Sequence, residues 1–392
     1  MQPFLALAVA LRYAGHEVRV AAPDDPDIGD DPNTVSLGVS FAEMARNVAP
    51  SAAGGIRAFR EHIRPAMSTL LSRVVDEALQ WQPDILVAHP KLLTVPVVAE
   101  HLGIAHLTVE LTPALTPTAA FPAAGVLNRS LGSAINRLSY RAAAAGERLF
   151  AADIRAAKER VGISPSRKMP PPAGSLVAVS PTLLSRPSDW PEITHLTGDW
   201  SWPTPAESPL DPALDDFLAQ DGPFLYAGFG SMRGGDASHR AEAIIEGGRR
   251  AGLRVLVSTG WGGLEPPPHT LGADVLVLPA VPHTTVLSRA AVAIHHGGAG
   301  TVHAASRAGV PSVLVPFLAD QPFWARLLQQ SGLAGPALHR NRLTADGVHT
   351  AIGDTVDRRA TVQQASDRMR SERGAETAAK IITRVANQGR AA

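Results

Sequence analysis

Residues 294–301 read IHHGGAGT, and this stretch decides the fold class of the chain. It follows a short apolar run at residues 290–294 and leads into apolar residues at helical spacing that end at Gly309. A strand, a glycine-rich turn and a helix start form an anion site, because backbone N–H groups and the positive end of the helix dipole face one point. We therefore expect a phosphate-binding turn at the carboxyl end of a parallel strand.

Two side chains strengthen this expectation, since His296 and Thr301 add hydrogen-bond donors to the same turn. A tight strand-to-helix turn that uses glycine for structural economy is the alternative. His295 points the other way along the strand, so we expect it to pack in the core.

Composition narrows the class of protein. The chain has 392 residues, which is enough for two domains. Its net charge is zero, so it has no overall positive potential that would attract nucleic acid. It contains no cysteine, so disulfides and cysteine zinc sites are excluded. No apolar run reaches the roughly 18 residues of a membrane span, so a cytoplasmic location is expected. The acidic loop at residues 24–27 is predicted to be solvated rather than metal-binding, and no metal is expected.

Strand-like and helix-like patterns alternate through both halves of the chain, which predicts an α/β fold with parallel sheets. Strands are predicted at 17–22, 35–41, 84–89, 104–111, 175–180, 224–229, 254–259, 275–278, 292–295 and 312–316. Helices are predicted at 4–13, 56–81, 93–102, 126–161, 237–251, 284–290, 299–308 and 320–331, with a helical tail over 344–385.

A proline-rich linker at residues 198–222 separates the two halves. We predict a first Rossmann-like, doubly wound domain over residues 1–200 and a second over 201–365, facing a central cleft. Residues 366–392 are expected to form a helix that packs back on the first domain.

Three further loops end predicted strands and carry candidate ligand contacts. Asp320 and Gln321 offer acceptors and donors for sugar hydroxyls, although Asp320 is also a favoured helix N-cap. Ser231 lies in a Gly-Ser turn that is either a second phosphate contact or a plain turn. Trp261 is expected either to lie near the nucleobase or sugar of a ligand or to be an exposed aromatic residue of the loop.

In these motifs the chain resembles the GT-B glycosyltransferases of family 1, in the bacterial branch that acts on sterols, macrolides and glycopeptides. The matching segments are FGSM at 229–232, STGWGGL at 258–264, VPH at 281–283 and the block at 295–324. The resemblance spans essentially the whole chain and implies a nucleotide-sugar as co-substrate, with no other cofactor.

The resemblance also implies roles for individual residues. The residues implied to bind the donor are Ser231, Trp261, Val281, His296, Gly298, Ala299, Gly300, Thr301, Asp320 and Gln321. Plant relatives carry a base-stacking aromatic at Ala280 and a ribose-binding glutamate at Ala304. Without that glutamate, the choice between a UDP-sugar and a dTDP-sugar stays open.

At its other end the sequence departs from the family. Relatives open with a strand and a Gly-(Thr/Ser)-Arg-Gly-Asp-Val loop whose aspartate serves as general base, whereas this sequence starts at Met1-Gln2-Pro3. We expect an opened sheet, and either upstream coding sequence that supplies the base or a poor enzyme. His16 and His89 are the remaining candidates for a base, each with a structural role as the alternative.

The expected reaction is inverting transfer of a hexose from a UDP- or dTDP-sugar to a hydroxyl of a lipophilic small molecule: a sterol, a polyketide such as a macrolide, or a glycolipid. The apolar loop at residues 112–126 is expected to shape the acceptor pocket. Peripheral membrane contact is among the expected interactions, and the oligomeric state stays open. The alternatives are a nucleotide-sugar-binding protein with impaired catalysis and a nucleotide-sugar epimerase.

Overall fold

A computed structural model of the chain describes residues 2–24, 33–40, 57–201, 210–230, 232 and 234–390. The chain divides into two compact units. The N-terminal unit comprises Met1–Pro181, Arg186–Trp202 and Arg373–Ala392, and the C-terminal unit comprises Thr182–Ser185 and Pro203–Glu372. Ser231 and most of the acidic loop at residues 24–27 lie outside the described residues.

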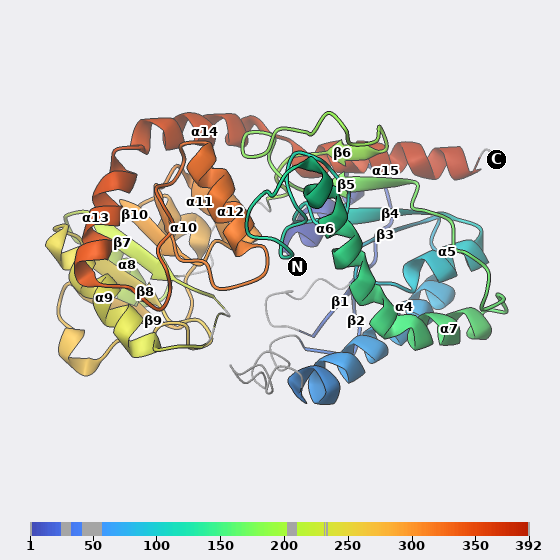
Figure 1. Cartoon of the computed structure of the whole chain (residues 1–392), viewed down its shortest axis with the longest axis horizontal. Helices are drawn as coiled ribbons and strands as arrows, with labels where there is room; N and C mark the ends of the chain where they lie inside the picture. Colours follow the sequence, from blue (N-terminus) through green and yellow to red (C-terminus); the bar gives the residue numbers. More distant parts are fainter. Residues whose placement is uncertain are drawn as a thin grey trace. The chain divides into compact units, whose positions relative to one another are not determined.

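The N-terminal unit contains short parallel strands and the helices that cover them (Figure 1). Its strands are β1 (Val20–Ala22), β2 (Thr34–Ser36), β3 (Ile85–Ala88), β4 (Ala105–Glu110), β5 (Gly174–Val177) and β6 (Thr194–Leu196). Its helices are α1 (Gln2–Tyr13), α4 (Arg64–Trp81), α5 (Val95–Leu102), α6 (Ser133–Ala145), α7 (Ala151–Arg160) and α15 (Gly374–Arg390). A π-turn at Phe59–Ile63 precedes α4, and a 3-10 turn at Gly146–Phe150 joins α6 to α7.

The strands of this unit form two separate sheets among the described residues. One sheet pairs β1 with β2, and the other has the order β3-β4-β5-β6, with all neighbours parallel. The opened sheet expected from the sequence is therefore present in the described part of the unit. Three of the four residues of β3 are only partly buried, because its outer edge has no neighbouring strand there.

Helices from the two ends of the chain cover one face of the four-stranded sheet. Leu7 and Leu11 of α1 and Ile382 of α15 pack with Leu107 and Val109 of β4. Figure 1 shows α15 running beside these strands. The C-terminal helix therefore belongs to the core of the N-terminal unit.

The C-terminal unit contains one five-stranded parallel sheet with the order β11-β10-β7-β8-β9. Its strands are β7 (Phe224–Gly228), β8 (Arg254–Ser258), β9 (Val275–Leu278), β10 (Val292–His295) and β11 (Ser312–Leu314). Its helices are α8 (Pro212–Ala219), α9 (Ala237–Arg250), α10 (His283–Leu287), α11 (Ala299–Ala308), α12 (Gln321–Gln330), α13 (Ala345–Val356) and α14 (Arg359–Ser371), with a 3-10 turn at Pro268–Thr270.

Both faces of this sheet are covered, because successive side chains of each strand point to opposite sides. Leu225 and Ala227 of β7 pack on the side of α9 and α13, in one apolar cluster with Ile244 and Val348. Tyr226, between them, packs with residues of α8, α10 and α11 on the other side. This is the doubly wound arrangement predicted from the alternating pattern.

The structure differs from the sequence predictions in one broken helix, one missed strand and one domain boundary, whereas the tail predicted to be helical over 344–385 is helical. The helix predicted over 126–161 is broken into α6, a 3-10 turn and α7, because Gly132 precedes α6 and Gly146 interrupts the α-helical pattern. The three-residue strand β6 was missed. The helical tail is three helices, and α14 contacts α11 in the C-terminal unit, so the chain enters the N-terminal unit at Arg373 rather than at residue 366.

Candidate functional site: a phosphate-binding turn at the switch point of the C-terminal sheet

The predicted turn lies where the strand order of the C-terminal sheet reverses. The chain runs outward from β7 through β8 to β9 and then returns to β10 on the other side of β7. His295 at the end of β10 pairs with Gly228 at the end of β7. The loops after these strands leave the sheet in opposite directions, and ligands of doubly wound folds bind in the crevice between them.

The turn after β10 presents an uncapped helix N-terminus. Gly298 occupies the N-cap of the ten-residue helix α11, and no side chain accepts a hydrogen bond from its first turn. The N–H groups of Ala299, Gly300 and Thr301 have no partner inside the helix. Gly300 is exposed and Thr301 is partly buried, so this end of the dipole is open to an anion.

His296 lies against this helix end. Its Nε2 is so close to Gly298 that a Cβ there would overlap the imidazole, so this position requires glycine. Its Nδ1 is buried without a hydrogen-bond partner in the described part of the chain. Burial lowers the pKa of His296 to about 4, so the ring is neutral at pH 7 and donates a single hydrogen bond.

The neighbouring histidine has a structural role, as predicted. His295 is completely buried, and its Nδ1 accepts the backbone N–H of Gly297 at 3.2 Å. Burial lowers the pKa of His295 to about 3. Beneath the turn, the hydroxyl of Tyr226 lies 2.9 Å from Nε2 of His283, and burial raises the pKa of Tyr226 to about 12.

The turns after β7 and β8 close on the same place. Trp261 donates its backbone N–H to the carbonyl of Gly230 at 3.1 Å, and a Cβ on Gly260 would overlap that carbonyl. A Cβ on Gly230 would in turn lie 3.5 Å from Cε1 of His296. The turn after β7 therefore lies against the His296 imidazole and is itself held by the turn after β8, where Trp261 is partly buried.

The residues predicted to hold the sugar are engaged within the protein. Asp320 is at the N-cap of α12, but its carboxylate accepts from Nε1 of Trp324 at 2.8 Å instead of capping the helix. Gln321 is buried; its Oε1 accepts the N–H groups of Phe317 and Leu318, and its Nε2 lies 3.1 Å from Sδ of Met232. Both residues organise the loop after β11 in this conformation, and their contact with a sugar stays a prediction.

Val281 lies in the loop between β9 and α10, partly buried against the apolar cluster on one side of the sheet. The loop places its backbone at the carboxyl end of β9, two strands from β7. Base recognition by this backbone stays a prediction.

Sequence reasoning missed Arg240, which ties several of these turns together. Its guanidinium is almost completely buried, donates to the carbonyl of Gly263 at 3.1 Å and lies over the ring of Phe317 at 5.3 Å. Nε and Nη1 of Arg240 lack partners among the described residues, and burial lowers the pKa of this arginine. The signal was present, since Arg240 lies four residues before Ile244 on the apolar face of a predicted helix.

Neither histidine proposed as a base in the N-terminal unit is arranged to take a proton. His16 precedes β1, at the amino end of the strand, and its Nε2 lies 2.7 Å from the hydroxyl of Thr383. His89 follows β3 at the carboxyl end, but its Nδ1 accepts the N–H of Lys91 at 3.2 Å. Burial lowers its pKa to about 4, so the neutral ring carries its proton on Nε2 and acts as a donor.

The loop predicted to shape the acceptor pocket is anchored by two carboxylates, one buried and one exposed. The carboxylate of Glu110, at the end of β4, accepts from the N–H groups of Leu115 and Thr116 and from the Thr116 hydroxyl. Further along, Asp189 accepts from the hydroxyl of Thr118 at 2.6 Å and the N–H of Ala119 at 2.8 Å. The Thr118 hydrogen bond is the largest cause that lowers the pKa of Asp189 to about 2.

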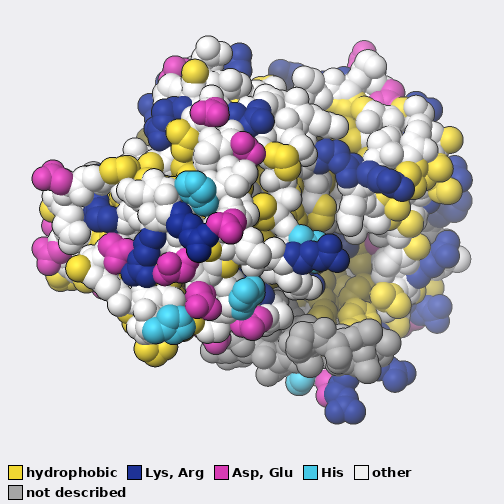
Figure 2. Space-filling view, turned by 60° about the vertical axis from the view of Figure 1, so that its left-hand side comes forward, with side chains coloured by type: hydrophobic (Ala, Val, Ile, Leu, Met, Phe, Trp, Pro, Cys, Tyr) yellow, Lys and Arg dark blue, Asp and Glu magenta, His cyan; other side chains and the backbone are white. Residues whose placement is uncertain are grey.

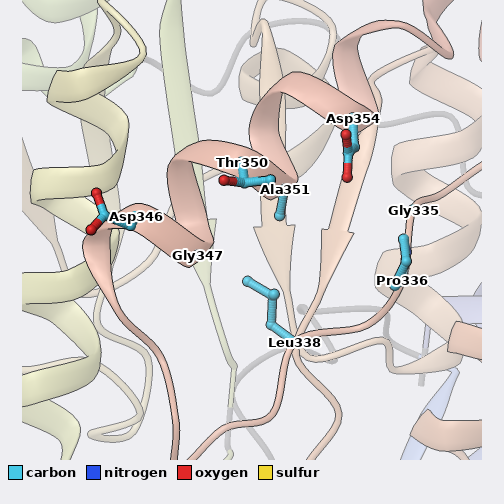
Figure 3. A pocket seen from close by; sticks show the side chains of 8 residues that line it. All are labelled: Gly335, Pro336, Leu338, Asp346, Gly347, Thr350, Ala351 and Asp354. Carbon is cyan, nitrogen blue, oxygen red and sulfur yellow. The ribbon is translucent and has the colours of Figure 1, made fainter.

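A separate hollow of about 300 Å³ lies elsewhere on the C-terminal unit, between α13 and the loop after α12 (Figure 3). Leu338, Pro336 and Ala351 supply apolar surface, and Asp354 points along its rim. Asp346 is paired with Arg250 at its border. None of the residues predicted to bind the donor lines this hollow, so it is distinct from the phosphate-binding turn.

Known proteins resemble this chain over most of its length. Residues 267–387, which include the turn, match the family described as erythromycin biosynthesis protein CIII-like, C-terminal domain. The O-mycaminosyltylonolide 6-deoxyallosyltransferase of Streptomyces fradiae is 31% identical, and the alignment covers 97% of this chain and 94% of that protein. The vancomycin aglycone glucosyltransferase of Amycolatopsis orientalis is 30% identical, with 97% and 93% covered.

Among solved structures, the glycosyltransferase of kitacinnamycin superimposes with a TM-score of 0.69 at 19% identity, covering 98% of this chain and 95% of that one. Two Rossmann-like units with a glycine-rich turn at the switch point are the arrangement of the GT-B fold. The chain belongs to the GT-B glycosyltransferases of the macrolide and glycopeptide type. In the part of the chain that the structure describes, no helix is long and apolar enough to cross a membrane.

Proposed function

We propose that this chain transfers a hexose from a UDP- or dTDP-sugar to a hydroxyl of a lipophilic small molecule, with inversion at the anomeric carbon. The carrying observation is the His296 imidazole packed on Gly298 at the uncapped start of α11. In this proposal the nucleotide diphosphate binds there, with the sugar near Asp320 and Gln321 and the base edge at the Val281 backbone.

The chemical step forms a bond from the acceptor oxygen to the anomeric carbon and breaks the bond from that carbon to the diphosphate. Negative charge then develops on the leaving diphosphate. In this proposal the donors for that charge are the N–H groups of residues 299–301, the Thr301 hydroxyl and the single N–H of the neutral His296 ring. The proposal needs no cofactor beyond the nucleotide-sugar.

The acceptor side needs a base that takes the hydroxyl proton. In the described arrangement, His89 is a hydrogen-bond donor and His16 lies at the amino end of its strand, so neither is assigned this role. This observation favours a second candidate function, in which the chain binds nucleotide-sugars without turnover. The loop at residues 112–126 is proposed to contact the acceptor, and the named acceptors of the relatives make a polyketide, a glycopeptide or a sterol the probes to use first.

The test is a titration of the full chain with UDP-glucose and dTDP-glucose, followed by transfer assays with a macrolide aglycone and a sterol. His296→Ala should weaken donor binding about tenfold or more, since a hydrogen bond to a charged group contributes roughly 1.5–3 kcal/mol. His269→Ala is the matched control, because His269 is exposed and paired with Glu242.

Each outcome separates the candidates. No binding of either nucleotide-sugar would reject the donor site. Binding without transfer to any acceptor would favour the binding protein, and conversion of the sugar alone would favour the epimerase. We further propose a cytoplasmic location with peripheral membrane contact, to be checked by cell fractionation.

A further inference from the structure

The outer face of α6 carries an unpartnered apolar stripe. Leu131, Ile135 and Leu138 are 46%, 43% and 57% exposed, and Leu149, on the 3-10 turn after the helix, is 56% exposed. Within α6, spacings of three and four residues place Ile135, Leu138, Ala142 and Ala145 on one side of the helix, whereas Leu131 lies just before it. We call this set the α6 stripe: Leu131, Ile135, Leu138, Ala142, Ala145 and Leu149, all exposed.

Basic side chains accompany the stripe. Residues 129–149 contain four arginines and a single acidic residue, Glu147. Arg137 is paired with Asp189 at 2.9 Å, whereas Arg129, Arg141 and Arg148 are exposed and make no ion pair within the described residues. In Figure 2, apolar and basic side chains lie next to one another on the N-terminal unit, at the right, whereas acidic and basic ones are interspersed on the C-terminal unit.

The inner face of α6 holds the proposed acceptor loop. Asn136 donates its side-chain N–H to the carbonyl of Ala119 at 2.8 Å, and the hydroxyl of Ser139 accepts the N–H of Ala123 at 2.8 Å. Tyr140 donates its hydroxyl to the carbonyl of Phe121 at 3.2 Å. One helix therefore carries the loop on one side and the exposed apolar stripe on the other.

We propose that the α6 stripe docks on an anionic lipid bilayer, with its leucines in the headgroup boundary and Arg141 and Arg148 on lipid phosphates. A helix with an apolar stripe and exposed arginines fits such a surface, because binding buries its apolar side chains and brings the arginines to the negatively charged lipid headgroups. A second copy of this chain fits less well, since it would present the same arginines without carboxylates to pair them. This docking rests on the proposed function in one respect: it would present the acceptor loop to a lipophilic acceptor dissolved in the bilayer.

The test measures co-sedimentation of the full chain with vesicles of phosphatidylglycerol and phosphatidylcholine in equal parts, and with phosphatidylcholine alone. The wild type should bind the anionic vesicles and lose affinity as salt is raised. Ile135→Ser with Leu138→Ser should weaken binding about a hundredfold, and Arg141→Gln with Arg148→Gln about fivefold for each arginine. Leu271→Ser, a similarly exposed leucine of the C-terminal unit, should leave binding unchanged.

These side chains are exposed, so the variants should unfold at the wild-type temperature, and that measurement accompanies each assay. The proposal is overturned if the wild type ignores anionic vesicles, if it binds neutral ones equally well, or if the serine variant binds normally. A concentration-dependent dimer that the serine variant abolishes would also overturn it in favour of a second copy. Failure of sugar transfer in solution would reject the proposed function while vesicle binding is still measured independently.

Discussion

The two units of this chain are built from the same kinds of element but differ in how their strands are joined. In the C-terminal unit five parallel strands form one sheet, and every residue of β7 and β10 is buried. In the N-terminal unit the described strands form two sheets, and β2 and most of β3 are only partly buried. The difference shows that the proposed donor turn lies on one continuous sheet, whereas the proposed acceptor loop is held by polar contacts at its own residues.

Hydrogen exchange should give the largest contrast between the units. Amides of β7 and β10 have neighbours on both sides and should exchange only on unfolding of the unit, whereas amides of β1 and β3 open locally. We expect at least about a hundredfold slower exchange in β7 and β10, measured by mass spectrometry on peptides. Equal protection of β3 and β10 would show that the separation of the N-terminal sheets does not lower local stability.

Acid should destabilise the phosphate-binding turn. The pKa of His295 is about 3 and that of His296 about 4 in the folded protein, below the usual 6.5. Between pH 6.5 and about 4 the unfolded state binds more protons, so the free energy of unfolding falls as the pH falls, by roughly 1.4 kcal/mol per pH unit for each histidine.

The measurement is thermal unfolding of the C-terminal unit across this range, with and without His295→Gln. The variant should flatten the pH dependence, whereas His269→Gln, at an exposed site, should leave it unchanged. A wild-type profile that is flat from pH 6.5 to 4 would contradict the burial of these rings as neutral groups.

Matched valine truncations sharpen the comparison of the two sheets. Val257→Ala, at a fully buried position of β8, should destabilise the C-terminal unit by about 2 kcal/mol through lost burial and a residual cavity. Val87→Ala, on the partly buried β3, should cost roughly half as much. Calorimetry of each variant checks this, and equal losses would mean that β3 is packed as tightly as β8.

The smallest expected effects are those of two substitutions, one that should change donor binding and one that should change acceptor binding. Arg240→Met keeps the volume of a buried side chain but frees the carbonyl of Gly263, so the KM for the nucleotide-sugar should rise about tenfold with little change in Tm. Asp189→Ala should instead raise the acceptor KM about tenfold, because Thr118 and Ala119 lose their anchor. Steady-state kinetics distinguishes them, and a rise in both constants for either variant would contradict the division of roles.

Sequence periodicity was sufficient for most of the C-terminal sheet. The predicted strand at 292–295 coincides with β10, and the predicted helix at 299–308 coincides with α11. Both are short, the strand is largely apolar, and the helix is periodic and ends at Gly309. The prediction over 126–161 failed because helical spacing continues across Gly146, while the chain there adopts a 3-10 turn.

For the candidate site, the local sequence predicted the position of a residue only where all the groups involved belong to one turn. His296, Gly298 and Thr301 follow one strand, so a linear motif describes their arrangement. Arg240 acts on Gly263 and Phe317, which are distant in sequence, and no local pattern predicts such contacts. Asp320 and Gln321 lie at the start of α12, beyond the end of β11 at Leu314, and their hydrogen bonds with Trp324 and Phe317 depend on how α12 packs.

The glycine-rich turn between β10 and α11 was therefore determined by the sequence itself, because glycine placement and a strand-to-helix transition are local properties of the backbone. Tertiary structure alone decided that the His296 ring lies between the turns after β7 and β10, and that one face of α6 holds a loop while the other is exposed. The physical reason is that parallel strands bring distant loops to one edge, and packing decides which side chains meet there.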